Sequence, residues 1–222
     1  MTFMNTRSNF DQSLQEVKSL QLKMAAEAET AIQNAMLALL NKDIELANTV
    51  INGDNAIDAL ESEIHEKALM LIARQSPVAK DLRRLHVALS VSSEVERLGD
   101  IAVNIAKSVV HIGNDTHVKE LVDIPHMMEA ALEMVRDAIT AFYSEDAELA
   151  TKCAEKDDQV DQMFGALIKE LLTYIPQNPD FTNQIIQLAF VCRYIERIAD
   201  HSTNIAENVI YLETGKRYNL NA

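Results

Sequence analysis

Apolar residues recur at three- and four-residue steps along nearly the whole chain, and no segment alternates convincingly between polar and apolar positions. The first apolar stripe runs from Leu14 to Ala38, and its spacing places these side chains on one face of a helix. We therefore predict a first helix from about Phe10 to Leu40. The same periodicity continues to the end of the chain, so the pattern predicts an all-α fold.

Capping signals place the next two helices. The carboxylate of Asp43 can accept backbone N–H groups of a first helical turn, so we expect a second helix to begin there and run to about Arg74. Gly53 weakens the middle of this helix without ending it. The pair Ser76-Pro77 is typical of an N-cap followed by proline at the first helical position, and predicts a third helix to about Val110.

The segment 111–117 carries Gly, Asn and Asp without any period, and is therefore predicted to be a linker. After it the helical pattern begins again. Three further helices are expected: one beginning at Asp123, one capped by Asp146 and ending near Pro176, and one running from Pro179 to about Thr214.

The two sets of three helices form an internal repeat. Residues 43–58 correspond to residues 146–161 at an offset of 103, with six identities in sixteen positions. Residues 96–106 correspond to residues 196–206 at an offset of 100, with six identities in eleven positions. We therefore expect two tandem three-helix bundles, over residues 8–112 and 118–216.

The repeated positions are acidic. Each repeat carries Asp-x-x-x-Asp on its second helix and Glu-x-x-x-Asp on its third, and like charges at this spacing cost about 0.2–0.5 kcal/mol per pair. Two such helices packed together would collect four carboxylates, a set of hard oxygen ligands that suits Mg, Mn, Ca or Fe, with more than one ion if carboxylates bridge. The candidate metal ligands are Asp54, Asp58, Glu96 and Asp100 in the first repeat and Asp157, Asp161, Glu196 and Asp200 in the second.

A solvated helix face is the alternative interpretation of these acids. With 34 acidic residues in 222 positions, chance alone gives on the order of five acidic pairs at helical spacing. Glu96 and Asp100 also point away from the apolar stripe of their own helix. Recurrence of both pairs in both repeats favours a site over this alternative. Arg97 and Arg197, each next to a motif glutamate, are expected to form structural ion pairs.

Composition narrows the possible functions. The net charge of −14 repels a phosphate backbone, which argues against nucleic-acid binding and favours cations or basic partner surfaces. Cys153 and Cys192 lack the spacing of a redox or metal pair and fit a reducing cytosol. None of the six histidines stands three residues after a glutamate, and no Gly-rich phosphate loop or nucleophile motif occurs. We therefore expect a soluble protein that is not an enzyme, with no apolar run long enough to span a membrane.

Three segments carry a family resemblance: QSPVAKDLR at 75–83, EVERLGDIAVNIAKSVV at 94–110 and YIERIADHSTNIAENVIYLETGK at 194–216. Together they resemble the PhoU family. The resemblance implies a cytoplasmic homodimer that negatively regulates phosphate uptake and phosphate-starvation signalling. It implies two partners, the ATPase subunit of the phosphate ABC transporter and a sensor histidine kinase, so that membrane contact would occur only through partners. It also implies metal sites, which can be multinuclear and hold Fe, Mn, Mg or Zn, at the eight acids named above.

Three basic residues lie in a segment of the first repeat, residues 78–84, that has no counterpart in the second. The corresponding residues 175–181 have a different sequence. Lys80, Arg83 and Arg84 are therefore a candidate partner contact that belongs to the first bundle, with a salt-bridged turn as the alternative. Two other functions stay open at this point. One is a metal-dependent enzyme or metal-storage bundle that uses the acidic clusters, and the other is a helical adaptor without metal.

Overall fold

The computed structural model describes the backbone of residues 2–220 and the side chains of residues 9–220. This part of the chain contains eight α-helices, one short 3₁₀-helix and no β-strand. The helices are α1 (Thr2–Asn41), α2 (Ile44–Gly53), α3 (Asn55–Gln75), α4 (Ala79–Ile112), α5 (Asp123–Ser144), α6 (Ala147–Ala154), α7 (Asp157–Tyr174), η1 (Pro179–Phe181) and α8 (Thr182–Thr214).

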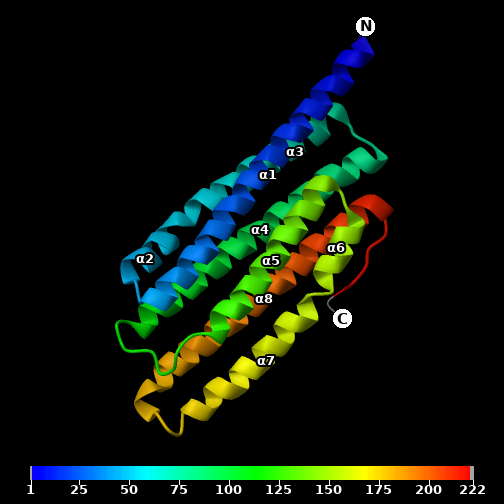
Figure 1. The fold of residues 1–222 in the computed structure, drawn as a ribbon. Helices are drawn as coiled ribbons and strands as arrows, with labels where there is room; N and C mark the ends of the chain where they lie inside the picture. The colour runs from blue at the N-terminus through cyan, green and yellow to red at the C-terminus, as the bar shows by residue number, and fades with distance from the viewer. Residues whose placement is uncertain (1, 221–222) are drawn as a thin grey trace.

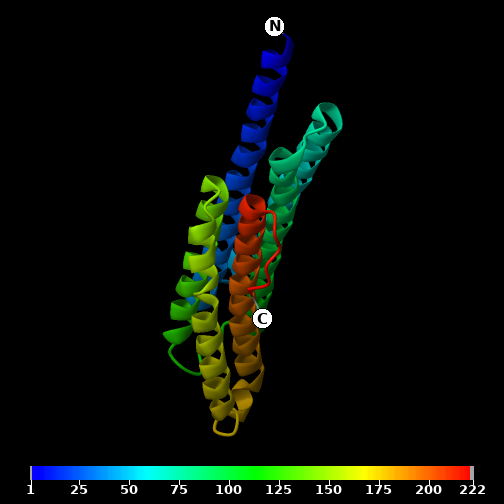
Figure 2. The same ribbon diagram turned by 90° about the vertical axis from the view of Figure 1, so that its right-hand side faces the viewer.

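The helices form two side-by-side bundles, as predicted (Figure 1). The first consists of α1, the pair α2–α3, and α4, and the second of α5, the pair α6–α7, and α8. The most extensive helix–helix contact in the described chain joins α4 to α8, so the third helix of each repeat forms the junction. Figure 2 shows that the N-terminal end of α1 and the turn between α3 and α4 extend beyond the second bundle.

The two helices of the junction run antiparallel. Lys80 Nζ donates to Glu213 Oε1 at 2.6 Å at one end, and Asn183 Nδ2 donates to the His111 carbonyl at 3.2 Å at the other. Residue numbers therefore rise along α4 as they fall along α8. The middle turns of both helices, which carry the Glu-x-x-x-Asp motifs, consequently lie at the same level of the junction.

One hydrophobic core continues through both bundles. Buried apolar side chains come from every long helix, and α7 contributes the fewest of them: Val160, Leu167 and Leu171. Burial of apolar surface is the main driving force for this packing, at about 25 cal/mol per Å². A smaller cluster fills the end of the first bundle that extends beyond the second, and consists of Phe10, Leu14, Ala68, Leu71 and Leu85.

Two predicted helices are interrupted, so the prediction of six continuous helices is wrong in number. The expected second helix consists of α2 and α3 with a break at Asp54, and the expected fifth helix consists of α6 and α7 with a break at residues 155–156. Both predicted N-caps are confirmed. Asp43 Oδ1 accepts from the Leu46 backbone at 2.9 Å, and Asp146 Oδ1 accepts from two first-turn N–H groups at 2.9 and 3.0 Å.

The prediction that Ser76-Pro77 begins a helix is also wrong. The Ser76 backbone N–H donates to the Ile72 carbonyl at 3.0 Å, and its φ of 45° is left-handed, so Ser76 ends α3. A residue before proline is disfavoured in the right-handed helical region, which is consistent with this role. The α4 helix begins two residues after the proline, at Ala79, and extended Val78 is its N-cap.

The remaining helix limits agree with expectation at Asp123 and Thr214, whereas α1 begins at Thr2, eight residues before the predicted start. None of the helices in residues 2–220 combines the length and the apolar character needed to cross a lipid bilayer.

Candidate metal sites

Both helix breaks bring an acidic motif to the start of a helix. Asp54 is the N-cap residue of α3, with Asp58 in the first turn, and Asp157 is the first residue of α7, with Asp161 one turn later. The free N–H groups and the dipole of a helix N-terminus favour negative charge by about 0.3–1 kcal/mol. The breaks therefore offset part of the repulsion within each acidic pair.

The first acidic cluster forms where the start of α3 faces the middle of α4. Burial raises the pKa of Asp54, and the nearby carboxylates of Asp58 and Asp100 raise it further. Burial and then the charge of Asp100 raise the pKa of Glu96 in the same way. The structure thus brings the four predicted acids of the first repeat within electrostatic reach of one another.

A glycine permits the close approach of α3 to α4 in this cluster. A Cβ at Gly99 would lie 2.9 Å from Ile57 Cδ1 and 3.3 Å from Asp54 Oδ1. A larger residue at this position would therefore have to displace the side chains of Ile57 and Asp54. The second repeat has Ala199 at the matching position, and this alanine is buried.

The predicted ion pairs of Arg97 are confirmed. Its Nε lies 3.3 Å from Glu96 Oε2 and its Nη1 donates to Asp100 Oδ2 at 3.0 Å, so one guanidinium bridges both motif acids of α4. Sequence reasoning missed a further acid at this cluster. Glu61 accepts from Ser93 Oγ at 2.8 Å, and its charge contributes to the raised pKa of Glu96.

The second cluster, between α7 and α8, is more strongly perturbed. Burial raises the pKa of Asp157 to about 6, with further contributions from Asp161 and Asp200. Burial and the charge of Asp200 raise the pKa of Glu196 to about 7. Glu196 is only 8% exposed, and its Oε2 has no hydrogen-bond partner among the described residues. The alternative of a solvated face is therefore wrong for Glu196.

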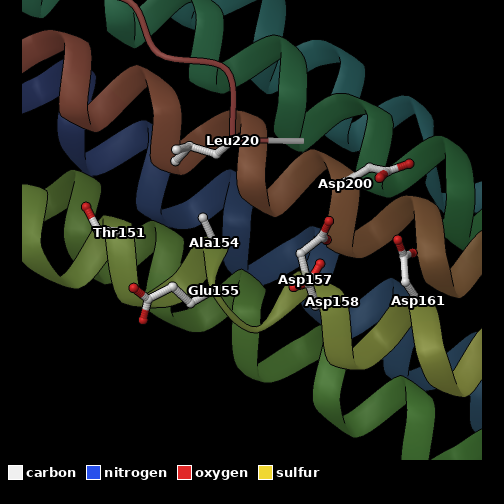
Figure 3. Close-up of a pocket in the computed structure, with 8 residues that line it drawn as sticks. All are labelled: Thr151, Ala154, Glu155, Asp157, Asp158, Asp161, Asp200 and Leu220. Carbon is white, nitrogen blue, oxygen red and sulfur yellow. The ribbon is translucent and has the colours of Figure 1, made fainter. Parts of the chain in front are cut away.

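An open groove of about 460 Å³ lies beside this second cluster (Figure 3). Figure 3 shows Asp157 and Asp161 projecting from α7 toward α8, which carries Asp200. Leu220, in the segment after α8, closes one edge of the groove. The groove is thus lined mainly by carboxylates and is accessible from outside.

The donor set fits a hard cation in type and in charge, because every candidate ligand atom is a carboxylate oxygen and one buried oxygen is unpaired. The carboxylates of each cluster are not yet directed at one common point. Within the described residues no group of three or more His, Cys, Asp or Glu side chains is already arranged as a metal centre. Binding an ion would require rotation of these side chains.

Arg193 is a second residue that sequence reasoning missed. Its guanidinium pairs with Glu196 Oε1 from one turn earlier on α8. The signal was present in the sequence, because Arg and Glu three residues apart on a helix are neighbours. Arg197, which was expected to form an ion pair, has none in the part of the chain that the structure describes.

The three basic residues of the first repeat contact the second repeat. Arg84 donates to both carboxylate oxygens of Glu145 at 2.9 Å, and Arg83 Nε donates to the Leu212 carbonyl at 3.3 Å. Lys80 completes the set through its bond to α8 described above. Lys80 and Arg84 form ion pairs, as the alternative of a salt-bridged turn expects, whereas the described contact of Arg83 is a hydrogen bond to a carbonyl. A role of these residues in partner binding stays a prediction.

Comparison with known proteins identifies the fold family. The family model described as "PhoU domain" matches residues 22–109 and again residues 124–209. A phosphate-specific transport system accessory protein PhoU homolog from Clostridium acetobutylicum is 36% identical, over 97% of this chain and 99% of that protein. A homolog with the same description from Aquifex aeolicus is 40% identical, over 91% of this chain and 92% of that protein.

Two crystal structures share the same arrangement of helices. The phosphate transport system regulatory protein PhoU from Streptococcus pneumoniae superposes with a TM-score of 0.87 at 32% identity, covering 95% of this chain and 99% of that one. PhoU from Pseudomonas aeruginosa gives a TM-score of 0.89 at 32% identity, covering 93% of this chain and 100% of that one. With two copies of the family's domain and relatives that match along nearly its full length, the chain belongs to the PhoU family.

Proposed function

We propose that this chain is a cytoplasmic regulator that restrains phosphate uptake and keeps phosphate-starvation signalling low when phosphate is plentiful. The observation that carries the proposal is the similarity to phosphate-transport accessory proteins over 97% of the chain. Burial raises the pKa of both Cys153 and Cys192 to about 12, so neither thiol is a ready nucleophile.

Metal binding is part of the proposal. The acids of the first cluster (Asp54, Asp58, Glu96, Asp100) and of the second (Asp157, Asp161, Glu196, Asp200) would each hold one or more ions of Mg, Mn, Zn or Fe. A bound ion would offset the repulsion among the carboxylates of a cluster and so would favour their charged form. Support comes from the raised pKa values and the unpaired Glu196 oxygen.

The proposed partners are the ATPase subunit of a phosphate ABC transporter and a sensor histidine kinase, bound by a homodimer of this chain. The net charge of −14 favours basic surfaces on those partners. Association with the ATPase should therefore be fast at low ionic strength and should slow as salt screens the charges.

Deletion of the gene in its host tests the regulatory role. We expect higher phosphate uptake and expression of phosphate-starvation genes in phosphate-rich medium, with recovery on re-expression. Unchanged uptake and expression would refute the proposal. The ATPase and the kinase should each be captured by the purified protein at low salt, and failure to capture either would remove that partner from the proposal.

Metal analysis of protein purified without chelator tests the second part. Metal in the protein without turnover of substrates in activity screens supports a regulator. Metal with turnover, or with loading to many ions per chain, would favour an enzyme or a storage bundle. Protein without metal that still binds the ATPase would favour an adaptor.

A further inference from the structure

The two acidic clusters differ at two positions where the repeats can be compared directly. Glu61 on α3 corresponds to Phe164 on α7 at the offset of 103, and Ser93 on α4 corresponds to Arg193 on α8 at the offset of 100. At this pair of positions the first repeat therefore carries one negative charge, and the second carries one positive charge. The difference between the clusters is two charge units at matched places in the fold.

Within each repeat the two side chains at these positions contact each other, so the two sequence differences form one local change of structure. In the first repeat Ser93 Oγ donates to Glu61 Oε1 at 2.8 Å. In the second repeat the guanidinium carbon of Arg193 lies 5.9 Å from the centre of the Phe164 ring, a cation–π geometry. The aromatic ring thus supports the arginine at the place where the first repeat has an acid.

Arg193 also contacts the motif itself. Its guanidinium pairs with one oxygen of Glu196, whereas the other oxygen of this buried carboxylate has no hydrogen-bond partner in residues 9–220. The charge of Arg193 opposes the effect of burial on the pKa of both Glu196 and Asp200. The side chain of Arg193 is 51% exposed, so it can leave the cluster without disrupting the core.

The arginine of the first cluster is placed differently. Arg97 is 57% exposed and bridges Glu96 and Asp100 from outside, and no arginine there comes from the turn before the motif. Its second-repeat counterpart Arg197 forms no ion pair in the described part of the chain. The arginine that pairs with the motif glutamate therefore occupies a different position in each cluster: it follows the glutamate in the first and precedes it by one turn in the second.

We propose that Arg193 is a resident counter-cation that makes the second acidic cluster bind divalent cations more weakly than the first, so that the first cluster fills at lower cation concentration. This inference rests on the metal-binding part of the proposed function. An ion that takes the unpaired Oε2 of Glu196 as a ligand binds against the positive charge that Arg193 places on Oε1 of the same carboxylate, and an ion that takes both oxygens must displace the guanidinium. Arg193 is thus a residue that determines the relative affinity of the two clusters, and it does not itself hold the ion.

The test measures Mn²⁺ binding by calorimetry to chelator-treated protein, with the first cluster disabled by Asp54→Asn and Asp100→Asn. In this background Arg193→Gln should bind Mn²⁺ about tenfold more tightly, since one opposing charge is removed from a partly exposed site. Arg193→Lys should give a smaller change, because it keeps the charge and loses the planar fork. Arg197→Gln is the matched control. It removes the same charge next to Glu196 from a side chain without an ion pair, and should change the affinity less than about threefold.

The reciprocal variant tests the same reasoning in the other repeat. With the second cluster disabled by Asp157→Asn and Asp200→Asn, Ser93→Arg should weaken Mn²⁺ binding to the first cluster about tenfold. If circular dichroism shows that Arg193→Gln does not fold, Ser93→Arg alone tests whether an arginine at this position weakens cation binding.

Each result has a distinct meaning. Unchanged or weaker binding by Arg193→Gln, or an equal gain from Arg197→Gln, would overturn the role of Arg193 and leave the proposed metal sites in place. Absence of Mn²⁺ binding by the wild type and by every variant would overturn both the role of Arg193 and the metal-binding part of the proposed function. The regulatory role would still be judged separately, by the deletion experiment.

Discussion

Replacing Glu145 with Gln is expected to weaken the contact between the two repeats. Glu145 lies in the turn between α5 and α6, and three cations from the first repeat converge on its carboxylate. Arg84 donates to both oxygens at 2.9 Å, Lys18 Nζ donates at 3.1 Å, and Lys80 Nζ lies 3.4 Å away. Gln keeps the size of the side chain and removes its charge, so the substitution tests the charge alone.

The magnitude follows from the pKa of this carboxyl group. Burial alone would raise the pKa of Glu145, but hydrogen bonds from Arg84 and Lys18 outweigh burial and lower it from 4.5 to about 2. A pKa that is lower in the folded state stabilises the protein above the unfolded pKa, and this stability is lost as pH falls toward the folded pKa. The difference corresponds to about 3 kcal/mol at pH 7, which declines to about 1 kcal/mol at pH 3. The side chain is only 14% exposed, so solvent screening is limited.

Urea unfolding of chelator-treated protein at pH 7 and at pH 3 measures this contribution. We expect Glu145→Gln to lose about 2–3 kcal/mol at pH 7 and clearly less at the lower pH. Glu148→Gln, one turn later, is the matched control. Its carboxylate pairs with Lys152 at 2.7 Å but is 80% exposed, so the loss should stay below about 0.5 kcal/mol. Equal losses for the two variants, or a loss for Glu145→Gln that does not shrink in acid, would refute the reasoning.

Three further predictions concern the acidic clusters. The pKa values of Asp157 (about 6) and Glu196 (about 7) are raised in the folded state, so metal-free protein should lose stability as pH rises from about 5 to 8. Thermal melts should show this decline, and Glu196→Gln should flatten it; a melting temperature that rises over this range would contradict the pKa values. Mn²⁺ or Mg²⁺ should raise the melting temperature by mass action and chelator should reverse the rise, whereas identical melts would argue against metal sites. Gly99→Ala should destabilise the protein by about 1–3 kcal/mol, because its Cβ would lie 2.9 Å from Ile57 Cδ1. Gly165→Ala, with no atom within 4 Å of the added Cβ in the interior of α7, should instead stabilise it by about 0.5–1 kcal/mol, and urea unfolding of both variants would detect the opposite signs.

The fold was accessible from the sequence because its main determinants are local and periodic. The caps Asp43 and Asp146 and the apolar stripes place the helices, and the repeat offset pairs the two bundles. The break at Asp54 had a local signal, because Asn52-Gly53 directly precedes it, although we expected Gly53 only to weaken the helix. The break at residues 155–156 had none: residues 154–156 have good helix propensity, so this break depends on how α6 and α7 pack against α8. Local signals do not report that packing.

The candidate sites were predictable in composition but not in detail. Spacing alone brought the eight acids together as two clusters, since each motif lies on one helix face. It did not show that Glu196 would be buried with one oxygen unpaired, because burial depends on how other helices pack around α8. Nor did spacing indicate that Arg193 contacts the second cluster, since we compared the positions that the two repeats share and not those that differ. The positions that differ show how the two clusters diverge.

The junction also joins residues that neighbour the two clusters. Glu94, two residues before the motif residue Glu96, accepts from Asn204 at 3.2 Å and pairs with His201 Nδ1 at 2.7 Å. His201 follows Asp200 directly, so one carboxylate on α4 contacts the residue next to the second cluster. The first repeat has Ile101 in place of this histidine, and the connection therefore runs in one direction only. Movement of α8 on cation binding would have to break or carry this contact, whereas α3 contributes no residue to it. The two clusters have similar compositions, but only the second lies next to a residue that contacts the other repeat through Glu94. Cation binding at the two clusters would therefore affect the junction differently.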